Sequence, residues 1–214
     1  MVVKLDNVSY LVRGGDYIAR DYDIEPDVSA ACYFYALAAA TGKRAMVKRM
    51  RKESLQGDMK FISLLEKMGC TVSWERDGRQ NLWLKGPDGK LKGMEVKMSD
   101  FSDQALTLAA IAPFADSEVT ITGIAHIRGQ ESDRIKVIVD ELAKMGILCN
   151  ELPDGVKIHP GTPKNTNIET YNDQRVAMSF AVTGLAGDGM TILNPMCCKK
   201  TFAGFFDEID RLEE

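Results

Sequence analysis

The chain has 214 residues, of which 45% are hydrophobic, enough to bury a core as one large domain or two small ones. Its 27 Lys and Arg against 31 Asp and Glu give a formal net charge of −4, which argues against a general nucleic-acid-binding surface, because such a surface needs a basic excess. No apolar run approaches the roughly 20 residues that span a bilayer, and no basic-then-apolar leader opens the chain, so we expect neither a membrane anchor nor a secretion signal.

The N-terminal stretch 1–24 carries no helix signal and no cluster of catalytic residue types. It fits strands with a turn at Gly14-Gly15. We expect residues 1–15 to form a connector strand region. No Pro-, Gly- or Ser-rich linker interrupts the rest, so residues 16–214 are predicted to form one domain.

Three segments then repeat one plan, at 26–50, 102–124 and 172–195. Each opens near an Asp (Asp27, Asp103, Asp173), continues as a helix rich in Ala and other small or apolar residues, and ends in a β-branched strand. An Asp at a helix start is most simply an N-cap. Helices that are apolar nearly all round are buried, so these three are expected in the interior.

Each segment next supplies an amphipathic helix, predicted at 57–69, 132–146 and 201–214. Apolar residues recur there at i, i+3, i+4 and i+7. They are Phe61, Leu64, Leu65 and Met68; Ile135, Ile138, Val139 and Leu142; and Phe202, Phe205, Phe206 and Ile209. Gly69 and Gly146 are placed as C-terminal stop signals, and in "QGD" (56–58) Asp58 fits a turn and a cap.

Strand pairs follow the first two amphipathic helices, with turns at Asp77-Gly78 and Asp154-Gly155. Strands and helices alternate within each segment. We therefore predict an α/β (α+β) fold of three repeated βαβαββ units, with buried parallel helices surrounded by sheets.

Five cysteines are present, an odd number without Cys-x-x-Cys spacing: Cys32, Cys70, Cys149, Cys197 and Cys198. With only two His residues, a zinc site is not expected. Reduced, buried thiols in a cytoplasmic protein are the default interpretation.

Two polar clusters lie next to these helices. In "HIRGQESDR" (126–134) the charged residues are either a solvated loop, with Ser132 or Asp133 as helix cap, or a functional loop. In "YNDQR" (171–175) Asn172 or Asp173 can cap the helix, but a cap does not explain Arg175, whose charge opposes the helix dipole. A bound carboxylate or phosphate would explain it, and so would a salt bridge to a nearby acid.

Lys199 and Lys200 precede the last predicted helix and are ordinarily surface lysines. If the three buried helices start at the same end, their N-termini together with Arg134, Arg175 and Lys200 would form one electropositive face. That face would suit a small, doubly anionic substrate.

These motifs resemble those of one enzyme family, in its order and from about residue 16 to the end. They are "EPDVSAACYF", "LQGDMKFISLLEKMG", "SDQALTLAAIAPFA", "GIAHIRGQESDRI", "TYNDQRVAMSF" and "KKTFAGFF". The chain is similar to the C-terminal half of 5-enolpyruvylshikimate-3-phosphate synthase. The resemblance implies transfer of the enolpyruvyl group of phosphoenolpyruvate to the 5-hydroxyl of shikimate 3-phosphate, with loss of phosphate through a tetrahedral intermediate. It implies no metal and no organic cofactor.

The resemblance also implies roles for individual residues. Asp103 matches a candidate general base at the shikimate hydroxyl, and Glu131 matches a glutamate proposed for proton transfer at the methylene carbon. Arg134 and Arg175 match arginines that hold phosphoenolpyruvate. Lys200 matches a lysine on its phosphate side. Further substrate-binding positions of the family correspond to Asp173, Gln174, Gln130 and His126.

Three of these positions depart from the family pattern. Gln130 stands where a lysine is common, Gln174 where a histidine is common, and His126 where an asparagine is common. Glutamine donates and accepts hydrogen bonds but carries no charge and shuttles no proton.

The family is about twice this length, and its first half supplies a Gly-Ser-Lys-Ser region and arginines that are not found here. We therefore expect the missing N-terminal half as a partner, and a chain that folds but does not turn over alone. Two alternatives stay open: a non-catalytic binding domain of the same fold, and the sister UDP-N-acetylglucosamine enolpyruvyl transferase.

Overall fold

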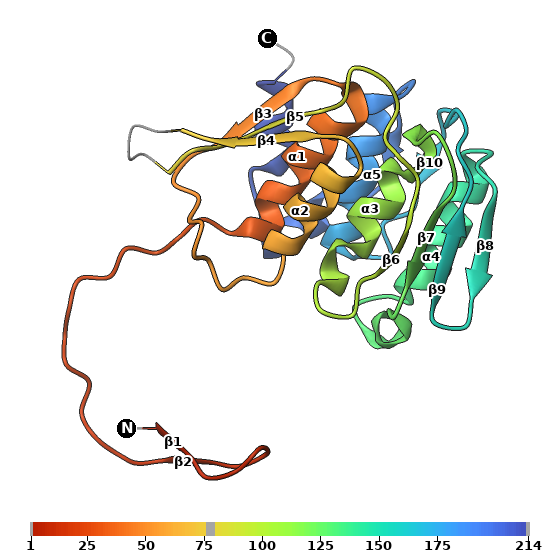
Figure 1. Ribbon diagram of the computed structural model, residues 1–214. Helices are drawn as coiled ribbons and strands as arrows, with labels where there is room; N and C mark the ends of the chain where they lie inside the picture. The colour runs from red at the N-terminus through yellow and green to blue at the C-terminus, as the bar shows by residue number, and fades with distance from the viewer. Residues whose placement is uncertain (1, 76–79, 213–214) are drawn as a thin grey trace.

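Three helices rich in small residues form the centre of the fold, in a computed structural model that describes residues 2–75 and 80–212 (Figure 1). They are α1 (Val28–Thr41), α3 (Ala105–Ile111) and α5 (Gln174–Ala186), and they pack on one another. Every residue of α3 is buried. The small side chains let the helices lie close together, as predicted for helices without a polar face.

The middle unit contains all six predicted elements. Strand β6 (Glu95–Lys97) leads through α3 to β7 (Val119–Thr122), and α4 (Arg134–Lys144) leads to the hairpin β8 (Cys149–Leu152) and β9 (Gly155–Ile158). The sheet order is β6-β7-β9-β8. The β6–β7 pair is parallel, and the β7–β9 and β9–β8 pairs are antiparallel.

The other two units are shorter. The first contains α1, β3 (Arg44–Val47), α2 (Met59–Lys67) and the strands β4 (Thr71–Trp74) and β5 (Leu82–Lys85), in an antiparallel sheet of order β3-β5-β4. The third contains the parallel pair β10 (Asn167–Ile168) and β11 (Thr191–Ile192) with α5 and α6 (Phe205–Asp210). Within the described residues, only the middle unit contains all six elements of the βαβαββ plan, while the predicted α/β (α+β) fold, with buried helices surrounded by sheets, is confirmed. The helical part of the repeat is confirmed.

Short 3-10 helices complete the connections. They are η1 (Ser102–Gln104), η2 (Ala112–Phe114), η3 (Ala125–Gly129) and η4 (Pro195–Lys200). In the described part of the chain, no helix is long and apolar enough to cross a membrane. All five cysteines are free thiols, and Cys32, Cys70 and Cys198 are buried as predicted.

Several predicted helix ends are confirmed. Asp27 Oδ1 accepts a hydrogen bond from the Ser29 backbone N–H at 2.9 Å, which caps α1. Gly69 and Gly146 follow α2 and α4 with φ of +107° and +77°, a backbone region that glycine adopts without steric cost. The β8–β9 hairpin turns at Asp154, as Leu152 pairs with Gly155. The predicted turn at Asp77-Gly78 lies outside the described residues.

The last helix is shorter than the predicted 201–214 and covers only Phe205–Asp210. The chain before it forms η4 and a turn, and Gly204, a poor helix former, occupies the N-cap position.

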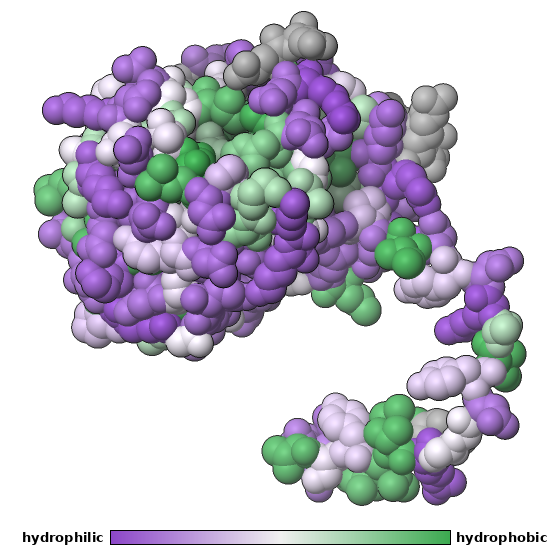
Figure 2. All heavy atoms as spheres, turned by 180° about the vertical axis from the view of Figure 1, so that it is seen from behind, coloured by the Kyte–Doolittle hydropathy of each residue, from purple (hydrophilic) through white to green (hydrophobic). Residues whose placement is uncertain are grey.

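The N-terminal turn lies between β1 (Val2–Lys4) and β2 (Tyr10–Val12), not at Gly14-Gly15. Its cause is an Asx-type turn, in which the Asp6 carboxylate accepts from the Val8 N–H at 2.8 Å. Figure 2 shows this hairpin and its arm standing apart from the body, with apolar side chains on their surface.

Candidate active site

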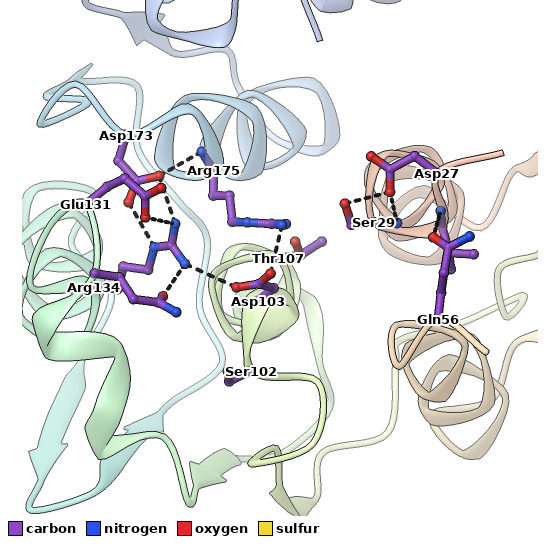
Figure 3. A network of polar contacts seen from close by, with 12 residues as sticks. Asp27, Ser29, Gln56, Ser102, Asp103, Thr107, Glu131, Arg134, Asp173 and Arg175 are labelled. Carbon is purple, nitrogen blue, oxygen red and sulfur yellow. Dashed lines mark hydrogen bonds and ion pairs between the residues drawn. The ribbon is translucent and has the colours of Figure 1, made fainter. Parts of the chain in front are cut away.

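Polar side chains converge where the three central helices begin (Figure 3). Arg175 at the start of α5 forms an ion pair with Asp103 of η1, just before α3, with Nη2–Oδ2 of 2.9 Å. Arg175 also lines a small cavity together with Asp27 and Ser29 at the start of α1. The three helices therefore begin at the same end of the molecule, as predicted.

A buried ion pair forms the base of this cluster. The Arg134 side chain is 2% exposed and Asp173 is fully buried. Two guanidinium nitrogens reach the two carboxylate oxygens, Nε–Oδ2 at 2.8 Å and Nη2–Oδ1 at 3.2 Å. Ser132 Oγ donates a third hydrogen bond at 3.0 Å. This geometry offsets the cost of removing two charges from water.

Asp173 has a further task. Its Oδ1 accepts from the Arg175 backbone N–H at 2.9 Å and so caps α5, which confirms the predicted cap. With all its partners inside the protein and no exposed surface, Asp173 positions Arg134 and α5. In this structure it has no surface with which to contact a substrate.

Two carboxylates form the open rim of the cluster. Asp103 is 41% exposed and lies 3.4 Å from Arg134 Nη1, and Glu131 is 36% exposed and lies 3.1 Å from Arg134 Nη2. Gln130 accepts a hydrogen bond from the same guanidinium. Asp103 makes no side-chain cap bond, so its predicted role as a helix cap is wrong: its carboxylate turns to the arginines instead.

Lys200 of η4 completes the rim. Its Nζ lies 2.7 Å from Glu131 Oε1. The hydrogen bond from Lys200 lowers the pKa of Glu131 to about 2, with smaller contributions from a backbone N–H and Arg134. Glu131 is therefore ionised at neutral pH and accepts a hydrogen bond from Lys200 Nζ.

The excess positive charge predicted for this face is absent from the six central groups. Asp103, Glu131 and Asp173 neutralise Arg134, Arg175 and Lys200 pair by pair. Only the Glu131–Arg134 pair is local in sequence, three residues apart; Asp103 and Asp173 reach Arg134 from 31 and 39 positions away, so their approach could not be read from local sequence. The converging helix N-termini still favour an anion here.

Of the two explanations for Arg175, the salt bridge is present in the structure, with Asp103 as its partner. Its side chain is 16% exposed and faces a cavity of about 100 Å³. The cavity walls come from α1, α5 and the segment after η4: Asp27, Ser29, Ala30, Tyr33, Arg175, Met178, Thr201 and Phe202.

The departures from the family pattern lie in different places. His126 on η3 is exposed, and its Nε2 lies 2.8 Å from the hydroxyl of Ser102, the residue before Asp103. Gln174 is 4% exposed, and its buried Oε1 accepts no hydrogen bond from the described residues. His126 and Gln130 thus border the cluster, while Gln174 lies in the interior.

Sequence reasoning missed the role of Gln56. Its Oε1 accepts from the Val28 N–H at 2.8 Å and its Nε2 donates to the Pro26 carbonyl at 2.9 Å, so it holds the start of α1. The neighbouring Asp58 occupies the N-cap position of α2 but makes no cap bond, which corrects its predicted role. Desolvation raises the pKa of Asp58, and Arg175 opposes that shift.

The turn before α5 is strained. Tyr171 and Asn172 have φ of +53° and +55°, the left-handed region that non-glycine residues rarely adopt. Such a residue costs about 1–3 kcal/mol, and its conformation persists only where surrounding contacts offset that cost. In the motif "TYNDQR" Asn172 and Asp173 are residue types common in turns, and Asn tolerates the left-handed region, whereas nothing in the sequence indicates a positive φ at Tyr171.

The chain is similar to known proteins along its whole length. The family model for EPSP synthase (3-phosphoshikimate 1-carboxyvinyltransferase) matches residues 2–209. The 3-phosphoshikimate 1-carboxyvinyltransferase of Nostoc punctiforme is 45% identical over all 214 residues, which cover 49% of that relative. That of Proteus mirabilis is 38% identical over 96% of this chain and 48% of its own length. The chain thus spans about half the length of the curated relatives it matches.

Solved structures give the same result. EPSP synthase from Acinetobacter baumannii superposes with a TM-score of 0.81 at 28% identity, covering 98% of this chain and 51% of the other. The enolpyruvyl transferase NikO from Streptomyces tendae, at 18% identity and a TM-score of 0.66, shares the fold. With a family model that matches nearly the whole sequence and relatives that align across all three units, the chain belongs to the EPSP synthase family.

Proposed function

We propose that this chain is the C-terminal part of an enzyme that transfers the enolpyruvyl group of phosphoenolpyruvate to the 5-hydroxyl of shikimate 3-phosphate and releases phosphate. One observation carries the proposal: Asp103, Glu131 and Lys200 line the open rim of a cluster, and Arg134 and Arg175 lie beneath them. A general base, a proton donor and two arginines are the groups that this reaction needs.

The arginines are the proposed ligands of phosphoenolpyruvate. Its carboxylate and phosphate are the kind of anion that guanidinium groups bind in a bidentate manner. Asp103 and Glu131 occupy these guanidinium groups here, so an arriving anion would compete with two partly exposed carboxylates. Displaced from Arg175, Asp103 is then free to accept the proton of the 5-hydroxyl.

The proton steps fall to the Lys200–Glu131 pair. A proton is added to the methylene carbon of phosphoenolpyruvate, and the shikimate oxygen forms a bond to the adjacent carbon. The tetrahedral intermediate loses phosphate by cleavage of its C–O bond, and a proton leaves the methyl group to restore the enol ether. Because Glu131 is ionised, the first proton reaches the carbon from Lys200, directly or by way of Glu131. Glu131 then accepts the proton that leaves the methyl group and returns it to Lys200, and the proton that Asp103 took from the hydroxyl leaves with the phosphate.

The same proposal assigns the chain an incomplete site. The cavity beside Arg175 is about 100 Å³, whereas pockets for small molecules are about 300–1,000 Å³. We infer that the N-terminal half of the relatives supplies the remaining walls and that this chain alone does not turn over. Residues 16–214 are then the C-terminal domain and residues 1–15 the strand region that connects it to that half.

A second surface is further support for a partner domain. An open groove of about 560 Å³ lies beside β11, the end strand of the two-stranded sheet. Apolar side chains dominate its walls: Met190, Ile192, Pro195, Met196, Ala203 and Phe206. In the first two units a hairpin covers the corresponding strand, so a hairpin from the other half is the proposed cover here.

Cellular context follows from the thiols. Five free cysteines suit a reducing compartment, so we infer that the enzyme works in the cytoplasm. Phosphoenolpyruvate and shikimate 3-phosphate are its proposed partners besides the other half, and glyphosate is a proposed inhibitor at the phosphoenolpyruvate position. No metal, organic cofactor or nucleic acid is part of the proposal.

Product analysis tests the assignment. The chain is combined with an N-terminal half from a close relative and incubated with phosphoenolpyruvate and either shikimate 3-phosphate or UDP-N-acetylglucosamine. Mass spectrometry should detect the enolpyruvyl ether of shikimate 3-phosphate and release of one phosphate per product. An enolpyruvyl ether of the nucleotide sugar would show the sister activity instead. Binding of shikimate 3-phosphate without any product would favour a non-catalytic domain.

A further inference from the structure

Glu141 is a buried carboxylate that the proposed reaction does not use. It lies on α4, and its side chain is fully buried. Its Oε1 accepts from the Tyr171 hydroxyl at 2.8 Å and from Lys144 Nζ at 2.7 Å, and its Oε2 accepts from the Glu169 N–H at 3.3 Å. Burying a carboxylate is unfavourable unless such partners are present, so its position calls for a physical reason.

Two of its three partners belong to the turn before α5. Glu169 and Tyr171 flank Thr170, and the turn continues through Asn172 to Asp173. Tyr171 and Asn172 both have positive φ, a conformation that persists where the surroundings fix it. Desolvation, and then the Glu141 carboxylate, raise the pKa of Tyr171, so its hydroxyl stays protonated and donates.

The geometry of α4 connects this contact to the site. Arg134 and Glu141 are seven residues apart, which is two helical turns, and so they lie on the same face of α4. Arg134 holds Asp173, and Glu141 holds Tyr171. One rigid helix therefore fastens the strained turn on both sides of Asn172.

We propose that Glu141 is a positioning residue: through Tyr171 it keeps the strained turn in place and thereby sets the direction of Arg175 toward phosphoenolpyruvate. It acts without touching the substrate. This inference deepens the proposed function and rests on it for its catalytic consequence. The claim about the turn itself stands on contacts of this chain alone.

Hydrogen exchange on the full chain tests the claim about the turn. Two amides report on it, because Asp173 N–H donates to the Thr170 carbonyl and Arg175 N–H to the Asp173 carboxylate. In Tyr171→Phe, which removes only the hydroxyl, both amides should exchange at least about 10-fold faster, while the amides of α1 keep their rates. The ring stays, and Glu141 keeps Lys144 and the Glu169 N–H as partners, so this variant should fold.

Tyr35→Phe is the matched control. It removes a tyrosine hydrogen bond of similar length, from the Tyr35 hydroxyl on α1 to the Leu82 carbonyl on β5 at 3.0 Å, which includes no residue of the turn. In this control, exchange at the Asp173 and Arg175 amides should not increase more than exchange at the amides of α1. Unchanged exchange at Asp173 and Arg175 in Tyr171→Phe, or an increase matched across α1 as in the control, would overturn the inference.

Kinetics of the reconstituted enzyme test the catalytic consequence. In Tyr171→Phe and Glu141→Gln we expect KM for phosphoenolpyruvate to rise about 10-fold, with KM for shikimate 3-phosphate within about twofold. Glu141→Leu should raise the first KM further, because Gln retains one oxygen acceptor. Equal changes in both KM values would overturn the catalytic part. Absence of turnover in the unsubstituted enzyme would count against the proposed function and leave the exchange result to decide the role of Glu141.

Discussion

Asp103 is the residue at which structure and proposed chemistry meet most closely. It touches both Arg134 and Arg175 yet remains 41% exposed, so among the described residues it is the acid whose side chain contacts both arginines and is still open to a substrate hydroxyl. A positioned general base contributes about 10²–10⁴-fold to a rate.

Asp103→Asn should therefore lower kcat of the reconstituted enzyme by about 10²-fold or more, because an amide cannot accept the proton. Phosphate release measures this. Asp88→Asn, which removes an exposed carboxylate paired with Lys85, is the control and should leave kcat unchanged. A kcat for Asp103→Asn within threefold of the unsubstituted enzyme would contradict the assignment of the base.

Glu131 gives a prediction for pH. Its pKa in the folded chain is about 2, against about 4.3 in an unfolded chain. The folded pKa is lowered, so the carboxylate adds stability above the unfolded pKa, and that contribution is lost as the pH falls toward 2. The side chain is 36% exposed, so solvent screening limits the contribution to about 1 kcal/mol or less.

Glu131→Gln should accordingly lower the free energy of unfolding at pH 7, and the difference from the unsubstituted chain should shrink at pH 3. Urea unfolding at the two pH values measures both. A difference that is as large at pH 3 as at pH 7 would show that the ion pair with Lys200 is not its origin.

At the scale of the elements, two N-caps of the same residue type differ in their surroundings. Asp27 caps α1, and its carboxylate accepts hydrogen bonds from the backbone N–H and the hydroxyl of Ser29. Asp173 caps α5 and also neutralises the buried Arg134. Removing a cap costs about 1 kcal/mol, whereas leaving a buried charge without its partner costs about 3–5 kcal/mol.

We therefore expect Asp173→Ala to lower the free energy of unfolding by about 3–5 kcal/mol and Asp27→Ala by about 1 kcal/mol. Urea unfolding of both variants, with circular dichroism as the probe, makes the comparison. Similar losses for the two variants would show that the Arg134–Asp173 pair contributes little beyond the cap.

Features that depend on residues close together in the sequence were predicted, and features that depend on residues far apart were not. The buried helices, the amphipathic helices α2 and α4 and the caps at Asp27 and Asp173 depend on residues a few positions apart, and these are confirmed. The pairing of Arg175 with Asp103 joins positions 72 residues apart, so the neutral charge of the cluster was not predictable from local pattern.

The position of Glu141 on α4 is a signal that the sequence already contains. It lies three residues after Ile138 and next to Leu142, on the buried stripe of α4, where an acid is unexpected. An acid on an apolar stripe indicates a buried polar partner. Its identity, Tyr171, comes from another unit and needed the structure. The N-terminal turn was predicted at the glycine pair Gly14-Gly15, but a local side-chain hydrogen bond of the Asp6 carboxylate determines its position.

At the scale of the whole molecule, the N-terminal hairpin contributes nothing to the core. The buried hydrophobic cluster begins at Val28, and the apolar side chains of β1 and β2 are exposed apart from the half-buried Val3, with Val2 at 63% and Val12 at 71%. A two-stranded hairpin without a partner is marginally stable at best.

Deleting residues 2–13 should therefore change the free energy of unfolding by no more than about 0.5 kcal/mol, the usual range for surface changes. Urea unfolding of the shortened chain measures this, and a parallel deletion within the core hairpin β8–β9 should prevent folding. A large loss of stability on removing residues 2–13 would show that the hairpin packs on this domain.

The central claim is that this chain contains half of an active site. The most direct measurement is phosphate release from phosphoenolpyruvate and shikimate 3-phosphate by the chain alone, by an N-terminal half alone and by the mixture, with association of the halves checked by light scattering. The account predicts no release above the buffer rate from either half and turnover by the associated mixture. Turnover by the chain alone, or an associated mixture that releases no phosphate, would contradict it.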